Sequence, residues 1–521
     1  MTEPHHDTSR RTVLQATLAG GVGALAGCLT DEATGGDDGA SDEFTIGLHS
    51  DPTDDDWDAF DYVVPYFTQV VEPLVGVSSD VEPEPLLATD WTAIDDTTWE
   101  FDLREGVTFH DGTDLTAADV VASFEATFDH WPWVDGWTGL DPGSTTAVDE
   151  TTVRFETTDP FPAFPGAISH HYFAIQNHDA ADAPVGTGPF EVDTTEDGEV
   201  RLVAFEQYRN ETPEPSALTF RHLEDDTTRV LSLENGDIDI AHDVPKDQAA
   251  AVDEHPETTI QTQVGNHAGL VAVNLYKSPT DDEGLRRALN WAVDQAELVE
   301  TVLDGIGMPA RGPFSSSIPW SIHEELPAYG PDRDRARELV DDSSYDGEEL
   351  SMLVDSEDGD DSRIAEVLQN WFDEIGVATE IVQVDPASFY DTFVAGEANL
   401  TIVGFGSNSA ASDYLVRAMF HSRGSDNYQR YEADGTGVYN PGDEVDRLIE
   451  DGYRAETGAE KREYYGEVQR RVLETGAIVP LYYDEYVLGT RASVSGIETH
   501  PIDKMLEWTE LSRTARGDDG A

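Results

Sequence analysis

Strand and helix patterns that alternate along the chain predict an α/β protein built from layered lobes with mostly parallel sheets. The length supports several structural units, because 521 residues correspond to roughly two to four units of about 150 residues. The chain also contains 10 Trp, 18 Tyr and 20 Phe, and each ring brings a large apolar area that needs a core. We therefore expect a folded body rather than a disordered acidic chain.

In the first half of the chain, period-two alternation predicts strands and an N-cap signal predicts a helix. Thr116 is the expected N-cap of that helix, with Asp119 three residues later. The expected elements are a strand at Phe44–His49, a helix leading into a turn over 61–75, a strand at Thr98–Arg104, a short strand and Asp-Gly turn over 106–112, a helix that opens at Leu115, and turn chemistry over 183–190 ahead of a strand.

Helix and strand patterns continue to alternate in the second half of the chain, which is typical of layered α/β lobes. The expected helices are Leu285–Leu303, Arg333–Asp341, Arg363–Ile375, Pro386–Val394, Asp443–Tyr453 and Ala459–Thr475. The expected strands are Leu270–Asn274, Leu350–Val354, Thr379–Val384, Leu400–Val403 and Ile478–Tyr483.

The charge is strongly negative and is spread over the whole chain. Lys and Arg number 30 and Asp and Glu 107, which gives a formal net charge of −77. Such a surface repels the phosphates of nucleic acids and anionic lipid headgroups, so neither is an expected partner. Carboxylate repulsion also needs screening, and the screening length shortens to about 3 Å in molar salt. The composition therefore indicates a halophilic protein.

The N-terminal segment reads as an export signal. Arg10 and Arg11 form a twin-arginine pair ahead of a short Ala- and Gly-rich apolar stretch over 16–27. The stretch is too short and too weakly apolar for a membrane-spanning helix. Cys28, the only cysteine, follows Leu-Ala-Gly and resembles the lipidated cysteine of secreted lipoproteins. A polar Gly- and Asp-rich tether then runs to residue 43.

Signatures of enzymes and metal sites are incomplete in this sequence. No Gly-x-Ser-x-Gly elbow occurs, and His323-Glu324 lacks the second histidine of a zincin helix. His170, His171 and His178 lack metal-ligand spacing, and surface or packing roles are favoured for them. The alternating aspartates at 54, 56 and 58 lack the glycine of a calcium loop. We expect no catalytic residue, no metal and no cofactor.

Motifs spread over about Phe44–Arg491 resemble the family 5 extracellular solute-binding proteins, which serve peptide- and nickel-type ABC importers. The matching stretches, in the order of the family, are Pro85–Trp91, Thr98–Gly112, Leu115–Val121, Gly186–Phe190, Asn235–Ile240, Asn274 with Leu285–Asp294, Tyr439–Pro441 and Val479–Tyr482. Most of these residues are expected to be scaffold rather than ligand contacts.

The resemblance implies a two-lobed fold of the type II periplasmic-binding-protein class, the large peptide-binder form, with an extra subdomain on lobe I. Two strands would link the lobes, which close on the ligand. Mapped onto this chain, the expected segments are 1–27 as twin-arginine lipoprotein signal, 28–43 as tether, 44–80, 185–264 and 481–521 as lobe I with a C-terminal tail, 81–184 as the extra subdomain, and 265–480 as lobe II.

The resemblance also places the ligand pocket, and the sequence departs from the family pattern there. Peptide binders of the family carry Trp-x-Gly-Asp on a lobe II loop, and its acid pairs with the α-ammonium of the peptide. Here Phe405 keeps the aromatic platform, but Asn408 replaces the acid. A buried amine without a counter-charge is costly. Free N-terminal peptides are therefore expected to bind only if Asp413, which precedes Tyr414, takes over the charge.

The opposite wall of the pocket is expected from the run His130–Trp137 in the extra subdomain. It contains three tryptophans, and convergent aromatic rings commonly line ligand pockets. We expect ligand contact from Trp133 or Trp137, with packing in the core as the alternative for either ring.

Together these observations predict a lipid-anchored receptor on the extracellular face of the cell membrane. It would capture a peptide or peptide-like organic solute, deliver it to an ABC permease, act as a monomer and perform no chemistry. One alternative is the same role for an oligosaccharide or a metal chelate, which Asn408 favours. A second, from another class, is a secreted hydrolase, which would require a nucleophile or metal constellation.

Overall fold

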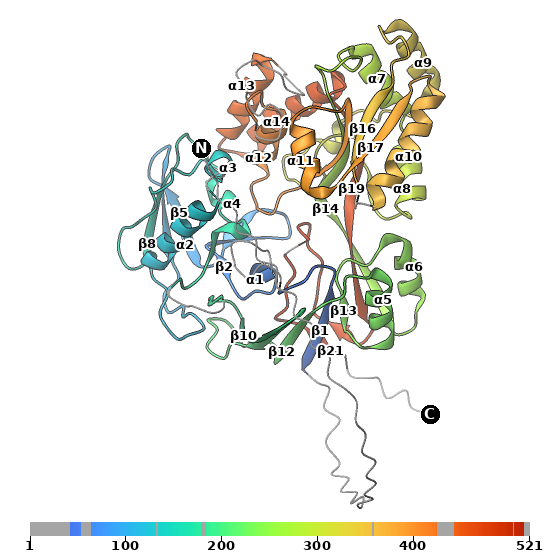
Figure 1. The fold of residues 1–521 in the computed structure, drawn as a ribbon. Coiled ribbons are helices and arrows are strands. Elements are labelled where there is room, and N and C mark those ends of the chain that lie inside the picture. Colours follow the sequence, from blue (N-terminus) through green and yellow to red (C-terminus); the bar gives the residue numbers. More distant parts are fainter. Residues whose placement is uncertain are drawn as a thin grey trace, which may run out of the picture. The chain divides into compact units, whose positions relative to one another are not determined.

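An 11-stranded mixed sheet is the largest feature of the fold (Figure 1). The computed structural model describes residues 42–53, 64–131, 134–178, 184–356, 359–424, 442–503 and 505–514. The strands of this sheet are β1 (Glu43–Leu48), β10 (Phe190–Glu196), β11 (Glu199–Ala204), β12 (Ala217–His222), β13 (Ile240–Ala241), β14 (Thr258–Val273), β15 (Met308–Pro309), β16 (Leu350–Asp355), β17 (Thr379–Val384), β18 (Leu400–Phe405) and β19 (Ile478–Arg491).

The strand order is β10-β11-β12-β1-β13-β19-β14-β18-β16-β17, with β15 paired to β19. β1 runs parallel to β12 and β13, and β16 runs parallel to β17 and β18. The other pairs, including the whole centre of the sheet, are antiparallel. The expectation of mostly parallel sheets is therefore wrong, because hairpins and the two long central strands run against their neighbours.

β14 and β19 connect the two ends of the sheet. They pair with each other along most of their length, and at opposite ends they pair with β13 and β18. The register of β14 shifts between Val264 and Ala268. Two glycines make room for rings from β19: a Cβ at Gly265 would lie 2.5 Å from the Tyr486 ring, and one at Gly269 2.3 Å from the Tyr482 ring. Only glycine fits at these positions.

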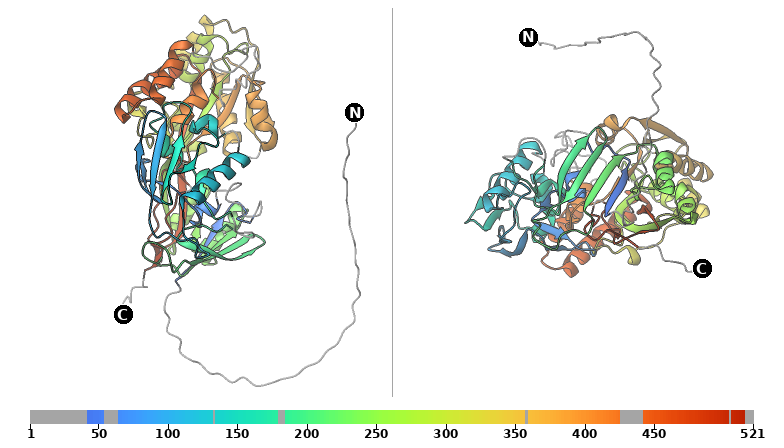
Figure 2. Two further views of the ribbon diagram at one scale, coloured as in Figure 1. Left: turned by 90° about the vertical axis from the view of Figure 1, so that its left-hand side faces the viewer. Right: turned by 90° about the horizontal axis from the view of Figure 1, so that it is seen from below.

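At one end of the sheet, β1 and β10–β12 lie side by side, as the right-hand view of Figure 2 shows. Their core includes Phe220 and Trp508, whose rings meet edge to face at 5.5 Å. Helices α5 (Asp226–Asn235) and α6 (Lys246–Glu254) pack beside β13 and β14 and bury a second small cluster around Leu233.

At the other end, apolar clusters cover both faces of β16 and β18. Met352 and Leu400 point into one cluster, while Leu353 and Val403 point into the other, as strand alternation requires. The helices α7 (Glu283–Ala292), α8 (Gln295–Val302), α9 (Arg333–Asp342) and α10 (Gly359–Glu374) contribute to the first cluster. The helices α11 (Pro386–Val394), α12 (Asp413–Phe420), α13 (Asp443–Tyr453) and α14 (Gly458–Glu474) contribute to the second.

The helix expected over Leu285–Leu303 is wrong in one respect: it is two helices. α7 ends at Ala292, and Asp294 caps α8 by accepting a hydrogen bond from the Glu297 N–H at 2.9 Å. The expected elements Thr379–Val384, Pro386–Val394 and Asp443–Tyr453 are confirmed at their predicted bounds.

A separate antiparallel sheet has the order β5-β6-β8-β7 and packs on α2 (Ala117–His130), which the left-hand view of Figure 2 shows. Its strands are β5 (Ala88–Ala93), β6 (Thr98–Leu103), β7 (Thr146–Ala147) and β8 (Thr152–Glu156). The N-cap prediction is confirmed, because Thr116 N–H donates to the Asp119 carboxylate at 2.8 Å. The short strand over 106–112 is wrong: a turn stands there, with one bridge between Thr108 and Asp114.

The helix leading into a turn that is expected over 61–75 is found over the described residues 64–71, but the expectation is wrong from Glu72 onward, where strands begin. α1 covers only Val64–Phe67, and β2 (Glu72–Pro73) and β3 (Val75–Val77) follow, paired with β9 (Ala174–Ile175) and β4 (Pro83–Pro85). Gln69 has φ 59°, which turns the chain. A Cβ at Gly186 or Gly188 would lie 1.9 Å from the carbonyl oxygen of Val70 or Gln69. The glycines of the Gly-Thr-Gly motif therefore allow the backbone at Gln69 and Val70 to pack directly against them.

A buried ion pair fastens the same region. Arg209 binds both carboxylate oxygens of Glu72, at 2.6 and 2.7 Å, and Thr187 donates to Glu72 at 2.8 Å. Tyr208 adds a fourth donor at 3.3 Å. Because both charges are buried, this bidentate geometry and the extra donors are what make the pair tolerable.

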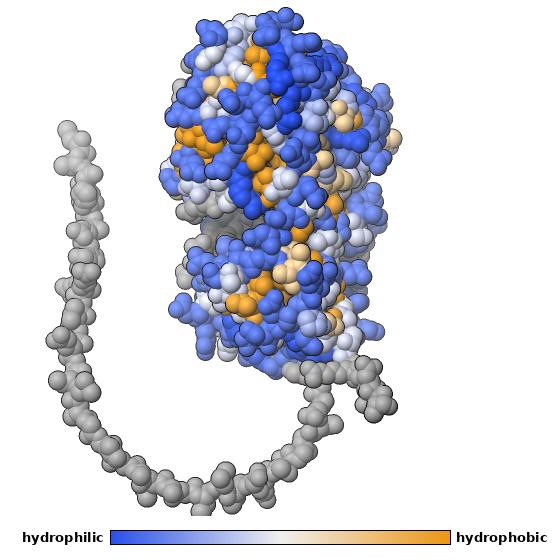
Figure 3. Space-filling view, turned by 90° about the vertical axis from the view of Figure 1, so that its right-hand side faces the viewer, coloured by the Kyte–Doolittle hydropathy of each residue, from blue (hydrophilic) through white to orange (hydrophobic). Residues whose placement is uncertain are grey.

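Short elements complete the fold: α3 (Asp135–Thr138), α4 (Phe164–Ala167), 3-10 turns at His171–Phe173 and His323–Glu325, and the strand pair β20 (Val494–Ser495) with β21 (Ser512–Arg513). Arg10, Arg11, Cys28 and the aspartates at 54, 56 and 58 lie outside the described residues. In the part of the chain that is described, no helix has the length and apolarity to span a bilayer. On the face in Figure 3, hydrophilic residues predominate and apolar ones form separate patches.

Candidate ligand-binding site

The carboxyl end of β18 carries the predicted aromatic platform. Phe405 is half-buried and packs against the apolar cluster of β18 and α12–α14. On either side of it, Gly404 and Gly406 lie under the ring of His267 from β14: a Cβ at Gly406 would fall 1.9 Å from the His267 Cδ2. The two glycines therefore allow an exposed imidazole to lie over the strand end, next to the platform. Sequence reasoning missed His267, and Gly-Phe-Gly was the available signal.

The loop after β18 is fixed by hydrogen bonds on both sides of Asn408. Asn266 Nδ2 donates to the carbonyl oxygen of Ser407 at 2.6 Å, and Ser409 N–H donates to the Ser407 hydroxyl at 3.2 Å. Tyr414 donates to the carbonyl oxygen of Gly406 at 3.2 Å. The Asn408 amide is half-buried in this rigid loop. It presents one acceptor and two N–H donors but no charge.

Asp413 is already paired with other side chains. Its side chain is buried, and Lys461 of α14 binds the Oδ1 at 2.7 Å. Tyr465 donates to the same oxygen at 3.1 Å, and burial, followed by the charge of Asp413, raises the pKa of Tyr465 well above its usual value. A ligand ammonium at this carboxylate would therefore meet a charge that Lys461 already neutralises.

The opposite wall is partly outside the described residues, which exclude Trp133 and the side chain of Trp137. The helix that carries Trp137, α3, contacts α12, which begins at Asp413. Trp131 stacks on Tyr172, with ring centroids 5.6 Å apart. The contact therefore joins α3 to the helix that follows the loop of Phe405 and Asn408.

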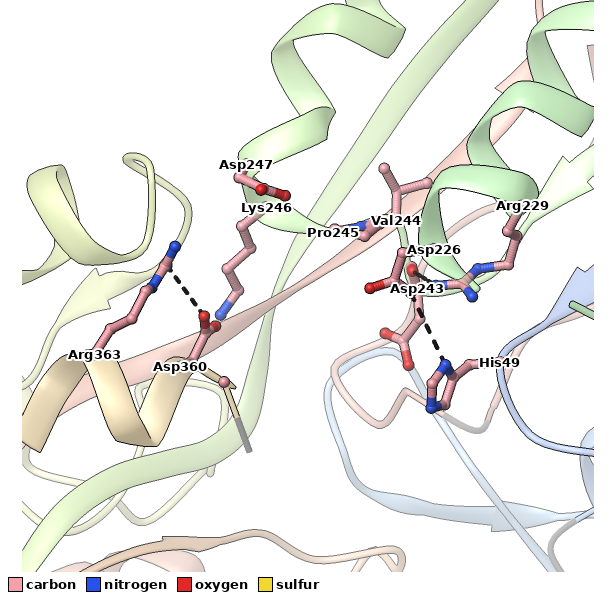
Figure 4. Close-up of a pocket in the computed structure, with 11 residues that line it drawn as sticks. His49, Asp226, Arg229, Asp243, Val244, Pro245, Lys246, Asp247, Asp360 and Arg363 are labelled. Atoms are coloured by element: carbon pink, nitrogen blue, oxygen red, sulfur yellow. Dashed lines mark hydrogen bonds and ion pairs between the residues drawn. The ribbon is translucent and has the colours of Figure 1, made fainter. Parts of the chain in front are cut away.

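A second candidate region is a charged cavity of about 530 Å³ between α5, the start of α6 and the start of α10 (Figure 4). Its charged residues are His49, Asp226, Arg229, Asp243, Lys246, Asp247, Asp360 and Arg363. Asp226 pairs with Arg229 at 2.6 Å and Asp360 with Arg363 at 3.1 Å, each within one helix. Lys246 pairs with Asp484 of β19 at 2.7 Å. We call this region the charged cavity.

His242, Asp243 and Asp503, at its edge, place ligand-type atoms within 4.8 Å of one another. The His242 Nε2 lies 3.2 Å from Asp503. Burial opposes the charged imidazole, but the pull of Asp503 and Asp243 outweighs it and raises the pKa of His242 to about 9. The short contact between His242 and Asp503 makes this cluster an ion pair in the structure.

The other histidines singled out in the sequence are held by packing. His170 and His171 are buried and stack at 4.2 Å, and His178 lies 3.2 Å from the Ser123 hydroxyl. His323 sits in a single 3-10 turn and hydrogen-bonds Tyr483 at 3.1 Å. These partners agree with packing roles.

Known proteins share this fold and sequence pattern. The family of bacterial extracellular solute-binding proteins, family 5 (its middle region), matches residues 82–427. A probable D,D-dipeptide-binding periplasmic protein of Escherichia coli, DdpA, is 25% identical over 447 residues, 82% of this chain and 83% of that protein.

Two solved structures show the same fold. NikA from Brucella suis in complex with Fe(III)-EDTA has a TM-score of 0.80 and 19% identity, covering 91% of this chain and 100% of that one. DppA from Helicobacter pylori in complex with the peptide STSA has a TM-score of 0.74 and 20% identity, covering 90% and 98%.

The fold and the family match together define an extracellular solute-binding protein of the two-lobed α/β class. The chain belongs to family 5 of these proteins, because the family matches more than half of its length. The predicted fold class and the predicted role, binding of a solute for an ABC importer, are confirmed.

Proposed function

We propose that the ligand is a peptide or peptide-like small organic solute, held at the end of β18 and handed to an ABC permease without chemical change. The observation that carries this proposal is the rigid loop around Asn408, which follows an aromatic platform beside the two strands that connect the ends of the sheet. Ligands of open α/β sheets bind at such carboxyl ends. DdpA is a probable D,D-dipeptide-binding protein and the DppA structure holds the peptide STSA, and both support the ligand class.

The proposed motion is closure of two lobes about β14 and β19. We place the lobe boundaries at 264/265 and 480/481, with the extra subdomain over 81–184. The register shift of β14 between Val264 and Ala268 supports this position, because an irregular ladder bends more easily than a regular one. The proposed walls are Phe405 and Asn408 on lobe II and Trp133 or Trp137 on the extra subdomain.

Recognition at Asn408 favours a ligand without a free ammonium at that point. The amide is neutral, and the nearby carboxylate of Asp413 already has Lys461 and Tyr465 as partners. A peptide with a blocked N-terminus satisfies this chemistry. So does the second candidate, an oligosaccharide or metal chelate, and the NikA structure was solved with Fe(III)-EDTA.

The proposed location is the outer face of the cell membrane, after twin-arginine export through Arg10-Arg11 and lipidation of Cys28. The protein would act as a monomer in a salt-rich medium. Cys28→Ala should release the protein into the medium, and Arg10→Lys with Arg11→Lys should leave the precursor in the cytoplasm. Cys28→Ala protein that stays on membranes after a salt and alkali wash would refute the anchor.

The ligand proposal is tested by calorimetric titration in molar salt with free and N-acetylated tripeptides. Phe405→Ala should weaken binding by about 1–3 kcal/mol, the order for a lost aromatic contact. Phe389→Ala is the matched control, since Phe389 is also half-buried against the same cluster but lies on α11. Equal losses in both variants would place the ligand elsewhere.

A further inference from the structure

A cavity of about 350 Å³ lies between the small sheet with α4 and the helical end of the large sheet. Trp91 of β5, Trp99 of β6 and Pro165 of α4 line it on one side. Trp320, Ser412 and Lys461 line it on the other. We call it the aromatic cavity. Ala410, Ser412 and Asp413, which follow Asn408 along the chain, line the cavity, whereas Phe405 and Asn408 do not.

The walls of the aromatic cavity are flat and apolar. Trp91 and Trp99 lie on one face of the small sheet, because Trp91 pairs with Phe101 and Trp99 stands two residues before Phe101. Trp320 is packed edge to face against Tyr465 at 4.9 Å, which fixes its ring. Three tryptophans and four prolines, Pro83, Pro162, Pro165 and Pro319, suit a flat apolar body.

Two polar atoms in this lining lack a partner among the described residues. The indole N–H of Trp99 and the hydroxyl of Ser412 are both buried without a hydrogen bond. Ser412 is 2% exposed and stands at the N-cap of α12, yet its side chain caps no backbone N–H. Buried polar atoms are nearly always satisfied, so two orphans in one cavity point to a ligand group that satisfies them. The indole donates only, so that group must accept.

The charges of the cavity select the kind of acceptor. Lys461 uses one of its three N–H groups on Asp413, which leaves it donors for a ligand. Glu82 and Glu456 line the cavity and are exposed, and Asp413 is a third carboxylate. One cation against three anions disfavours a ligand carboxylate. An uncharged amide or carbonyl oxygen accepts the same hydrogen bonds without that repulsion.

We propose that the aromatic cavity is a second ligand site, which binds a small uncharged molecule with a flat apolar body and a carbonyl or amide oxygen. The oxygen accepts from the Trp99 N–H and the Ser412 hydroxyl, and the body lies against Trp91 and Trp320. Because both sides of the cavity contribute, such a ligand binds the closed arrangement more tightly than an open one and shifts the population toward it. The site stands whether or not the proposal for Phe405 and Asn408 holds.

The test uses fluorine NMR of 4-fluorophenylacetamide with the full chain in molar salt. The probe should broaden and saturate with one site. 4-Fluorophenylacetate, which carries a charge, and 4-fluoroethylbenzene, which lacks an acceptor, should each bind at least about fivefold more weakly, the value of one lost hydrogen bond. Absence of saturable binding by the amide, or tighter binding of the acetate, would overturn the proposal.

Variants identify the site. Trp99→Phe and Ser412→Ala should each weaken the amide about fivefold. Both should leave the melting temperature without probe unchanged or higher, because each removes an unsatisfied buried group.

Trp291→Phe is the matched control: its indole N–H is also buried and has no hydrogen-bond partner among the described residues, but it lies beside Tyr329 and Arg335, outside the cavity. Phe405→Ala should also leave the probe unaffected. Equal weakening in Trp291→Phe, or no change in Trp99→Phe and Ser412→Ala, would show that the probe binds elsewhere.

Discussion

The charged cavity and the aromatic cavity are both places where parts of the chain far apart in sequence face each other, and they are built in opposite ways. In the charged cavity, the pairs Asp226–Arg229 and Asp360–Arg363 each stay within one helix, and Lys246 pairs with Asp484 of the neighbouring β19. Across the seam of the aromatic cavity, contacts join the two sides. Phe161 stacks on Tyr453 at 4.0 Å with ring planes 3° apart, and the Ala410 N–H donates to Ser169 at 3.0 Å.

The two cavities show two ways in which a chain with a net charge of −77 can hold distant segments together. Ala411 is buried in the core of the small sheet, and such an apolar contact carries no charge that salt must screen. Facing surfaces that carry charge approach only when the repulsion is screened. Apolar contacts across the seam and the screening of charge by salt therefore contribute independently to the fold. Variants can measure the two contributions one at a time.

The largest expected effect is that of salt on the whole fold. Removal of salt should cost most of the free energy of unfolding, of the order of 5–15 kcal/mol for a domain, because carboxylate repulsion is no longer screened. Tryptophan fluorescence followed during dialysis should report unfolding, with partial recovery at acid pH as carboxylates are neutralised. A melting temperature that stays flat from dilute buffer to molar salt would contradict the account.

Each of the two cavities has a lysine–aspartate ion pair with the same N–O distance, so the two sites can be compared directly. Lys461–Asp413 in the aromatic cavity and Lys246–Asp484 at the charged cavity are both 2.7 Å, but the Asp413 side chain is 3% exposed and that of Asp484 30%. Lys461→Met should cost about 3–5 kcal/mol, because it leaves a buried carboxylate unpaired. Lys246→Met should cost about 1 kcal/mol or less. Denaturant titrations in molar salt compare the two, and equal costs would refute the difference in burial.

His242 gives a smaller effect that depends on pH. Its folded pKa of about 9 lies above the ordinary value, so its contribution is complete below about pH 6.5 and is lost as the pH rises through 9. The loss should be on the order of 1–3 kcal/mol between pH 7 and 9.5. His242→Gln should flatten this slope in thermal melts. An unchanged slope in the variant would mean that other groups carry it.

His110 of the small-sheet region is the opposite case and serves as control. Burial lowers its pKa to about 4, so its contribution is present above about pH 6.5 and is lost as the pH falls toward 4. His110→Gln should therefore leave the alkaline slope unchanged.

The smallest expected effect is a change of specificity at Asn408. Asn408→Asp places a carboxylate beside the aromatic platform, which should improve binding of free peptides relative to N-acetylated ones by about 1–2 kcal/mol at moderate salt. Competition titrations with matched free and acetylated tripeptides measure the ratio. A ratio that Asn408→Asp leaves unchanged would show that the amine does not approach this loop.

Local patterns predicted most helices and strands of the helical end. Thr379–Val384 and Pro386–Val394 were predicted at the bounds that the structure shows, where Asp385 caps the helix by accepting from the Ser388 N–H. The break at Asp294 was missed because apolar spacing continues through Val293, although the N-cap signal was present. Mixed pairing around β14 and β19 was missed because strand direction depends on partners far away in sequence.

The candidate site was predictable only in part for the same reason. Phe405 and Asn408 could be named as candidates because both lie in one short stretch that resembles a loop motif of the family. The place of His267 over Gly406 depends on the register of β14 against β18. The pairing of Asp413 with Lys461 joins α12 to α14, and no local pattern announces it. Residues that meet through tertiary packing need the fold before their role can be read.

The central claim, reversible capture of a small organic solute, is tested most directly by equilibrium dialysis of the full chain in molar salt against mixed free and N-acetylated di- and tripeptides, read by mass spectrometry. We predict that some of the peptides, mostly acetylated ones, are enriched on the protein side and are recovered chemically intact. This enrichment should be lost with Phe405→Ala. No enrichment of any member, or recovery of the enriched peptides as cleavage products, would contradict it.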